Sequence, residues 1–126
     1  MARNQISIID DDESVRKTTT LLIESFGFQA RGFDSAEKFL TSGHVNDTSC
    51  LVVDILMPGM NGLQLQSQLT AAGNRIPIIF MTAQEDEESR RRAVQAGAIA
   101  FLNKPLKDVQ LLQIIHSALG HEKGYM

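Results

Sequence analysis

The sequence predicts an α/β fold of the flavodoxin-like (βα)5 type, with a doubly wound parallel sheet of five strands in the order 2-1-3-4-5. Five short apolar runs recur at intervals of about 22 to 25 residues, the spacing of successive strand–helix units. Most of the runs are continuous rather than alternating, as expected of parallel strands that helices cover on both faces. Helix-like stretches that end in glycine separate the runs. Regular alternation of strand and helix implies right-handed crossovers and helices on both faces of one sheet.

The apolar runs place the strands near residues 6–9, 28–33, 51–53, 76–81 and 99–102. The second run is interrupted by Gln29 and Arg31, so we expect it at an edge of the sheet. The first helix should end at Gly27, and Asn61 should open the third. The second helix should begin with a capping-box-like pair, Asp34 and Glu37. Asp12 is expected to cap the first helix.

The last helix, from about residue 108 to 119, is apolar on more than one side. A helix that covers one face of a sheet needs only one apolar stripe. The surplus predicts a homodimer through a surface made by the fourth helix, the fifth strand and the fifth helix. The apolar residues of this helix are Val109, Leu111, Leu112, Ile114, Ile115 and Ala118.

Length and composition favour one soluble domain. The 126 residues suit a single core, which we assign to residues 1–120, with 121–126 as a tail or the start of a linker. The net charge of −3 argues against direct nucleic acid binding, because Lys and Arg are not in excess. The single cysteine, Cys50, fits a reducing compartment. No apolar run approaches the roughly 20 residues that span a bilayer, and the N-terminus shows no signal peptide. We therefore expect a cytoplasmic protein.

Polar residues follow four of the expected strands at the point where each strand ends. Asp10 and Asp11 follow the first, Asp54 the third, Thr82 the fourth and Lys104 the fifth. Ligands of such sheets bind beyond the carboxyl ends of the strands, so these side chains should share one pocket. Clustered carboxylates repel one another and require a counterion. Mg²⁺ suits this role, because it prefers oxygen ligands and often holds a phosphate.

The charges of this pocket balance when Mg²⁺ is included. The three carboxylates carry −3, and Mg²⁺ with Lys104 supplies +3. A phosphoryl group of about −2 on Asp54 would take the pocket to about −1, a modest change to which nearby donors can respond. The hydroxyl of Thr82 and the ammonium of Lys104 are both suited to hydrogen-bond phosphoryl oxygens.

Four segments, residues 8–16, 53–62, 80–83 and 101–105, resemble the motifs of response-regulator receiver domains in their order and spacing. The chain looks most similar to the CheY-like receivers of FixJ-type two-component transcription regulators. The resemblance implies that Asp54 takes a phosphoryl group from a sensor histidine kinase. It also implies Mg²⁺ binding by Asp11 directly, by Asp10 mainly through water, by Asp54, and by the backbone carbonyl of Leu56.

The same resemblance assigns a switch to Thr82 and Phe101 and a cis peptide bond to Lys104–Pro105. It implies a signalling switch rather than an enzyme, one that assists only its own phosphotransfer and dephosphorylation. Family members tune attack by water at the position that Leu56 occupies. A leucine there positions no water and favours a longer-lived phosphoryl group. The cognate kinase, the stimulus and any effector domain stay open.

Other interpretations compete with this one. Asp10 and Asp12 form an Asp-x-Asp pair after the first strand, which would suit a haloacid-dehalogenase-like phosphatase with Asp10 as nucleophile. A flavin or nucleotide carrier shares the expected fold, although three carboxylates repel a phosphate ester. Taken singly, the acidic residues suit a solvated loop, and Phe101 suits the core.

Overall fold

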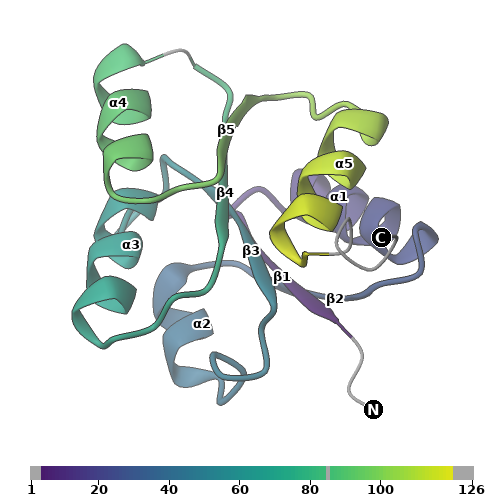
Figure 1. Cartoon of the computed structure of the whole chain (residues 1–126), viewed down its shortest axis with the longest axis horizontal. Helices are drawn as coiled ribbons and strands as arrows, with labels where there is room; N and C mark the ends of the chain where they lie inside the picture. The colour runs from purple at the N-terminus through teal and green to yellow at the C-terminus, as the bar shows by residue number, and fades with distance from the viewer. Residues whose placement is uncertain (1–3, 85, 121–126) are drawn as a thin grey trace.

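The computed structural model describes residues 4–84 and 86–120, which form one parallel sheet with helices on both faces (Figure 1). The strand order is β2-β1-β3-β4-β5, which confirms the predicted topology. The interrupted second strand lies at the edge, as expected. The elements in chain order are β1 (Gln5–Ile9), α1 (Glu13–Ser25), β2 (Gln29–Phe33), α2 (Ala36–Thr41), β3 (Cys50–Asp54), α3 (Gly62–Ala71), β4 (Ile78–Thr82), α4 (Glu87–Gln95), β5 (Ala100–Asn103) and α5 (Asp108–Ala118).

The two faces of the sheet carry separate cores because successive strand residues point to opposite faces. Helices α2, α3 and α4 cover one face, and α1 and α5 cover the other (Figure 1). In β3, Leu51 and Val53 face the first layer, whereas Val52 faces the second. All five residues of β3 and all five of β4 are buried, in keeping with their continuous apolar runs.

The helix starts follow local capping chemistry, with one correction to the prediction. Asn61 caps α3 in a complete capping box with Gln64, as expected for the opening residue. The prediction of Asp34 and Glu37 as a capping pair for α2 is wrong. Ser35 is the cap, and its hydroxyl accepts a hydrogen bond from the Lys38 backbone N–H at 3.0 Å.

Asp34 and Glu37 are engaged elsewhere. The Asp34 carboxylate pairs with the Lys38 ammonium at 3.1 Å, one helical turn away. The Glu37 carboxylate accepts a hydrogen bond from the Met60 backbone N–H at 3.0 Å. Neither carboxylate therefore caps α2, because Asp34 is engaged by a side chain of the same helix and Glu37 by a distant backbone N–H.

The apolar side chains of α5 divide into a buried group and an exposed group. Leu111 and Ile115 are buried against the sheet, whereas Val109 is 66% exposed. Val94 in α4 and Ile99 before β5 are also exposed large apolar side chains. The helix therefore buries one stripe and leaves apolar surface over, as the sequence indicated.

Two further expectations concern membranes and the chain end. None of the helices within residues 4–84 and 86–120 has the length and apolar character that crossing a bilayer requires. The tail or linker assigned to residues 121–126 lies outside the described residues.

Candidate functional site

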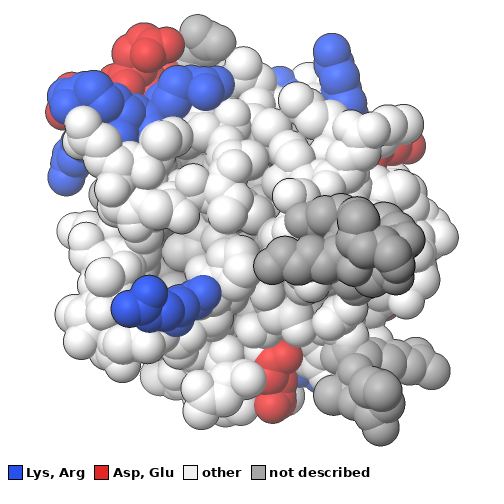
Figure 2. Space-filling model, viewed as in Figure 1, with Lys and Arg blue, Asp and Glu red and all other residues white. Residues whose placement is uncertain are grey.

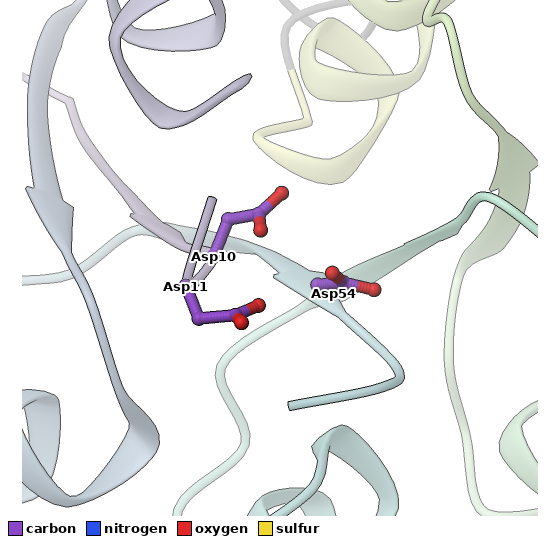
Figure 3. Close-up of side chains that lie close together, drawn as sticks. All are labelled: Asp10, Asp11 and Asp54. Carbon is purple, nitrogen blue, oxygen red and sulfur yellow. The ribbon is translucent and has the colours of Figure 1, made fainter. Parts of the chain in front are cut away.

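Three carboxyl groups meet at the carboxyl edge of the central strands (Figure 3). Asp10 and Asp11 follow β1, and Asp54 ends β3. Because β1 and β3 are neighbours with Ile9 paired to Val53, the residues that follow this pair lie side by side. Each carboxyl group offers one oxygen, and these oxygens all lie within 4.8 Å of one another. Asp10 is fully buried, Asp54 is 7% exposed, and Asp11 is exposed.

Lys104, directly after β5, brings a positive charge into this cluster. Its ammonium lies 2.8 Å from an Asp10 carboxylate oxygen and 3.1 Å from an Asp54 oxygen. The backbone N–H of Lys104 donates to the carbonyl of Thr82 at 2.8 Å, which anchors the segment after β5 to the end of β4. The peptide bond between Lys104 and Pro105 is cis. Sequence spacing placed this lysine at the pocket, and the structure shows which carboxylates it contacts.

Burial and charge oppose one another at Asp54. Burial raises the pKa of its carboxyl group, the hydrogen bond from Lys104 lowers it, and the charge of Asp10 raises it again, leaving the pKa above its usual value. For Lys104, burial by itself lowers the pKa, but the two carboxylate partners outweigh it and raise the pKa overall. One ammonium among three carboxylates leaves a net negative pocket, which favours a cation.

The donor set fits Mg²⁺. Carboxylate oxygens are hard ligands, and opposite ligands of an octahedral Mg²⁺ lie about 4.2 Å apart, twice the metal–oxygen distance. The spread of the three oxygens, up to 4.8 Å, is close to that span. Small side-chain movements are enough to close the difference.

Short backbone segments hold the two buried acids. Asp10 accepts a hydrogen bond from the Asp12 N–H at 2.9 Å, and Asp54 accepts one from the Leu56 N–H at 3.2 Å. Gly62 lets α3 begin against the backbone of Asp54. A Cβ at Gly62 would lie 2.9 Å from the Asp54 carbonyl oxygen, too close for any side chain. The start of α3 therefore packs directly under the end of β3.

Thr82 and Phe101 lie on the neighbouring strands β4 and β5. The Thr82 side chain is buried, and its hydroxyl donates to the carbonyl of Gln84 at 2.7 Å while accepting from the Gln84 N–H at 3.1 Å. Phe101 is 6% exposed and belongs to the core, with its ring centroid 6.4 Å from that of Phe80. The core interpretation of Phe101 therefore holds for this conformation.

Sequence reasoning missed two arginines that contact this region. Arg90 of α4 places its guanidinium carbon 5.2 Å from the centre of the Phe101 ring and donates to the Phe101 carbonyl at 3.3 Å. Arg16 of α1 donates to the carbonyl of Asp10 at 2.8 Å. Both lie within a helix, where an arginine is ordinarily a solvated residue. The one available signal for Arg16 was its position a single turn after the capping residue Asp12.

Residues 6–116 match the family model described as the response regulator receiver domain. Nodulation protein W of Bradyrhizobium diazoefficiens is 37% identical over 118 residues, which cover 94% of this chain and 52% of that protein. The transcriptional regulatory protein FixJ of Azorhizobium caulinodans is 36% identical over 115 residues, covering 91% of this chain and 54% of FixJ. The low-resolution structure of the response regulator StyR matches with a TM-score of 0.87 at 42% identity, covering 98% of this chain and 63% of that one. The chain thus spans about half the length of the curated relatives it matches.

Proposed function

The chain belongs to the response regulator receiver domain family, and from this premise we propose that Asp54 is its phosphoryl acceptor. Receiver domains are signalling switches of two-component systems that interact with histidine kinases, and they generally bind Mg²⁺ at an acidic pocket. One observation supports Asp54 over Asp10. Asp54 retains a small exposed surface, whereas Asp10 is fully buried beneath its partners. Of these two carboxylates, only Asp54 is exposed to an incoming phosphoryl group, which also argues against the phosphatase interpretation with Asp10 as nucleophile.

The transfer itself exchanges one bond to phosphorus for another. The phosphorus–nitrogen bond of a kinase phosphohistidine breaks as a carboxylate oxygen of Asp54 bonds to phosphorus, and the released imidazole takes up a proton. Lys104, now held between Asp10 and Asp54, is placed to follow the added negative charge onto the phosphoryl oxygens. The Asp10 carboxylate keeps one of its oxygens on the Asp12 N–H and so stays in place.

Asp11, Asp54 and the backbone carbonyl of Leu56 would hold Mg²⁺ directly, with Asp10 acting mainly through water. When bound, Mg²⁺ supplies positive charge that lets carboxylate and phosphoryl oxygens approach one another. The support for this set is the close approach of the three carboxyl groups and their uncompensated charge. The Leu56 side chain is 55% exposed and apolar. It therefore positions no water near the phosphoryl group, and we infer slow autodephosphorylation.

The output switch in this proposal consists of Thr82 and Phe101. In the present conformation the Thr82 hydroxyl bonds Gln84, so its capture by a phosphoryl oxygen would release the segment after β4. Movement there would reach Phe101, whose ring and carbonyl both contact Arg90 of α4. A change at Asp54 would thus become a change of the α4 surface.

This surface is the proposed dimer interface, formed by α4, β5 and α5. Its exposed apolar side chains, Val94, Ile99 and Val109, support a protein partner. Charged side chains of both signs gather over α4 on the face in Figure 2, where the described residues form no broad basic surface. The net charge of −3 leaves no excess of Lys and Arg for contact with DNA phosphates, so we assign any DNA contact to a part of the protein other than the receiver at residues 1–120. We place the reaction in the cytoplasm, where the thiol of Cys50 stays reduced.

Chemical trapping tests the acceptor. The protein is incubated with Mg²⁺ and acetyl phosphate, reduced with borohydride, and mapped by mass spectrometry for the homoserine that marks an acyl phosphate. We expect the mark at Asp54, its loss in Asp54→Asn, and its loss in EDTA. A mark on Asp10 in the wild-type protein would refute the proposal and restore the phosphatase interpretation.

Analytical ultracentrifugation tests the dimer. We expect a monomer in EDTA and a dimer with Mg²⁺ and beryllofluoride, which mimics the phosphoryl group. Val109→Glu should keep the protein monomeric in both conditions, and the matched substitution Leu21→Glu on α1, equally exposed, should not. A monomer of the wild-type protein in both conditions would count against the interface.

A further inference from the structure

We propose that Arg16 is a positioning residue for the Mg²⁺ site, which it serves by holding the backbone carbonyl of Asp10. This inference rests on the proposed function. The Arg16 guanidinium donates to the Asp10 carbonyl oxygen at 2.8 Å. That carbonyl belongs to the peptide unit joining Asp10 to Asp11, so the hydrogen bond acts on the orientation of both acids.

Backbone and side-chain hydrogen bonds hold the turn between β1 and α1, and Arg16 supplies two of them. The Asp10 N–H donates to the carbonyl of Phe33 in β2 at 3.1 Å, and the Asp12 N–H donates to the Asp10 carboxylate at 2.9 Å. The Arg16 N–H donates to the Asp12 carbonyl at 2.9 Å, as in an ordinary first helical turn. The Asp10 carbonyl is held by the Arg16 side chain. Without that side chain, the peptide unit that carries Asp11 loses its side-chain anchor.

The path of the Arg16 side chain depends on the glycine at position 32. A Cβ added at Gly32 would lie 2.9 Å from Cγ and 3.2 Å from Cδ of Arg16, closer than side chains pack. Gly32 does not have a positive φ, so its backbone conformation does not demand glycine. The missing side chain matters here for space alone. The stem of Arg16 crosses β2 over Gly32 and so reaches the end of β1.

A positioning role and a charge effect predict opposite results. Arg16 is a cation near the acidic pocket, and through space a cation weakens Mg²⁺ binding. If Arg16 acted only by its charge, removing it would strengthen Mg²⁺ binding. If it positions Asp10 and Asp11, removing it would weaken binding, because loss of a group that orients metal ligands typically costs a factor of 10 to 100 in affinity. The sign of the change therefore separates the two.

Isothermal titration calorimetry with MgCl₂ tests the proposal on the wild-type protein, Arg16→Met, Arg16→Lys and Gly32→Ala. We expect Arg16→Met to bind Mg²⁺ about tenfold more weakly. Gly32→Ala, which keeps the guanidinium but displaces its stem, should weaken binding in the same direction. Arg16→Lys keeps the charge with a single-point donor and should lie between Arg16→Met and the wild type. Lys17→Met is the matched control, since it removes an exposed cation of α1 that pairs with Glu13.

Amide hydrogen exchange in EDTA provides a readout that does not depend on Mg²⁺. We expect faster exchange at the Asp12 amide, which donates to the Asp10 carboxylate, in Arg16→Met and in Gly32→Ala, with amides in the middle of β3 unchanged. Mg²⁺ binding by Arg16→Met as tight as or tighter than that of the wild type, or unchanged exchange at the Asp12 amide, would overturn the proposal. If Arg16→Met fails to fold by far-ultraviolet circular dichroism, Gly32→Ala decides by the same two criteria. A wild-type protein that binds no Mg²⁺, or an Asp11→Asn variant that binds it equally well, would refute the metal site itself, and the exchange data would still decide on Arg16.

Discussion

Replacing Asp54 with asparagine should stabilise the metal-free protein at neutral pH. Asp54 is a buried carboxylate close to two others, and burial with the nearby charge of Asp10 keeps its pKa above the usual value despite Lys104. A carboxyl group whose pKa is raised on folding destabilises the folded state when it is ionised. Asparagine has nearly the same shape, carries no charge, and turns an amide donor toward the neighbouring acids.

The size of the effect follows from the distances in the pocket. At 4.8 Å, the upper limit on the separation of the carboxyl oxygens, and an effective dielectric constant near 20, each acidic neighbour repels Asp54 by about 3.5 kcal/mol. At 3.1 Å, Lys104 attracts it by about 5 kcal/mol on the same scale. Solvent screens the exposed Asp11, whereas the burial of Asp54 adds to the destabilisation. We therefore expect Asp54→Asn to raise the free energy of unfolding by about 1 to 2 kcal/mol.

Urea unfolding followed by circular dichroism between pH 3 and pH 8 in EDTA measures this difference. The sign depends on pH in a defined way. Below the ordinary pKa of 3.8, Asp54 is neutral in both folded and unfolded chains, and the difference should vanish. It should grow as pH rises above 3.8 and reach its full value above the raised pKa of the folded state. The substitution should raise the free energy of unfolding most near pH 7.

Mg²⁺ should make the wild-type protein more stable than the Asp54→Asn variant. A ligand that binds only the folded protein adds about 2.7 kcal/mol of stability at one hundred times its dissociation constant. The wild-type protein should gain this increment. The Asp54→Asn variant should gain little of it, because Asp54 is a proposed Mg²⁺ ligand. An Asp54→Asn variant that is less stable than wild type at pH 7 in EDTA would refute the reasoning. So would a stability gain that persists unchanged at pH 3.

Three further predictions concern single side chains. Lys104→Met should lower the free energy of unfolding by about 3 kcal/mol in EDTA, because it leaves Asp10 and Asp54 without their cation. Saturating Mg²⁺ should restore part of this loss of stability. Equal losses in EDTA and in Mg²⁺ would contradict this account. Leu56→Asn should shorten the lifetime of the phosphoryl group in a single-turnover decay, and an unchanged or longer lifetime would contradict the proposed role of the leucine. Burial raises the pKa of the Cys50 thiol to about 12. A thiol reagent at pH 8 should therefore modify Cys50 slowly in the native protein and rapidly in urea. Rapid labelling of the native protein would show that the thiol is accessible.

Much of the fold was predictable from local sequence patterns. Apolar runs at strand spacing identified all five strands, with boundaries displaced by one or two residues, as at residues 76 and 77 before β4. Asn61 and Asp12 were predictable caps because a helix start depends on residues only two or three positions away. The same logic failed for Asp34 and Glu37. Their partners were Lys38 and the distant Met60, and local pattern has no access to the second of these.

In the candidate site, too, some features were predictable from the sequence and others depended on tertiary contacts. Asp10, Asp11, Asp54, Thr82 and Lys104 were predictable as neighbours, because the carboxyl ends of adjacent parallel strands meet at one edge of the sheet. Which carboxylate oxygens Lys104 contacts was not predictable from that rule. Lys104 and Asp10 lie 94 positions apart, and their contact depends on how the segment after β5 turns back over the sheet.

Sequence alone was sufficient for the strand order and for the acidic pocket, because periodicity and parallel topology constrain these features. Tertiary structure was needed to show the Thr82 hydroxyl turned toward Gln84, the stripe of α5 that is buried, and the crossing of Arg16 over Gly32 to the Asp10 carbonyl. These features arise where side chains from separate elements compete for the same space and the same hydrogen-bond partners. Only the packing of α1 against β2, with room for an arginine stem where glycine has no side chain, decides where the Arg16 guanidinium lies.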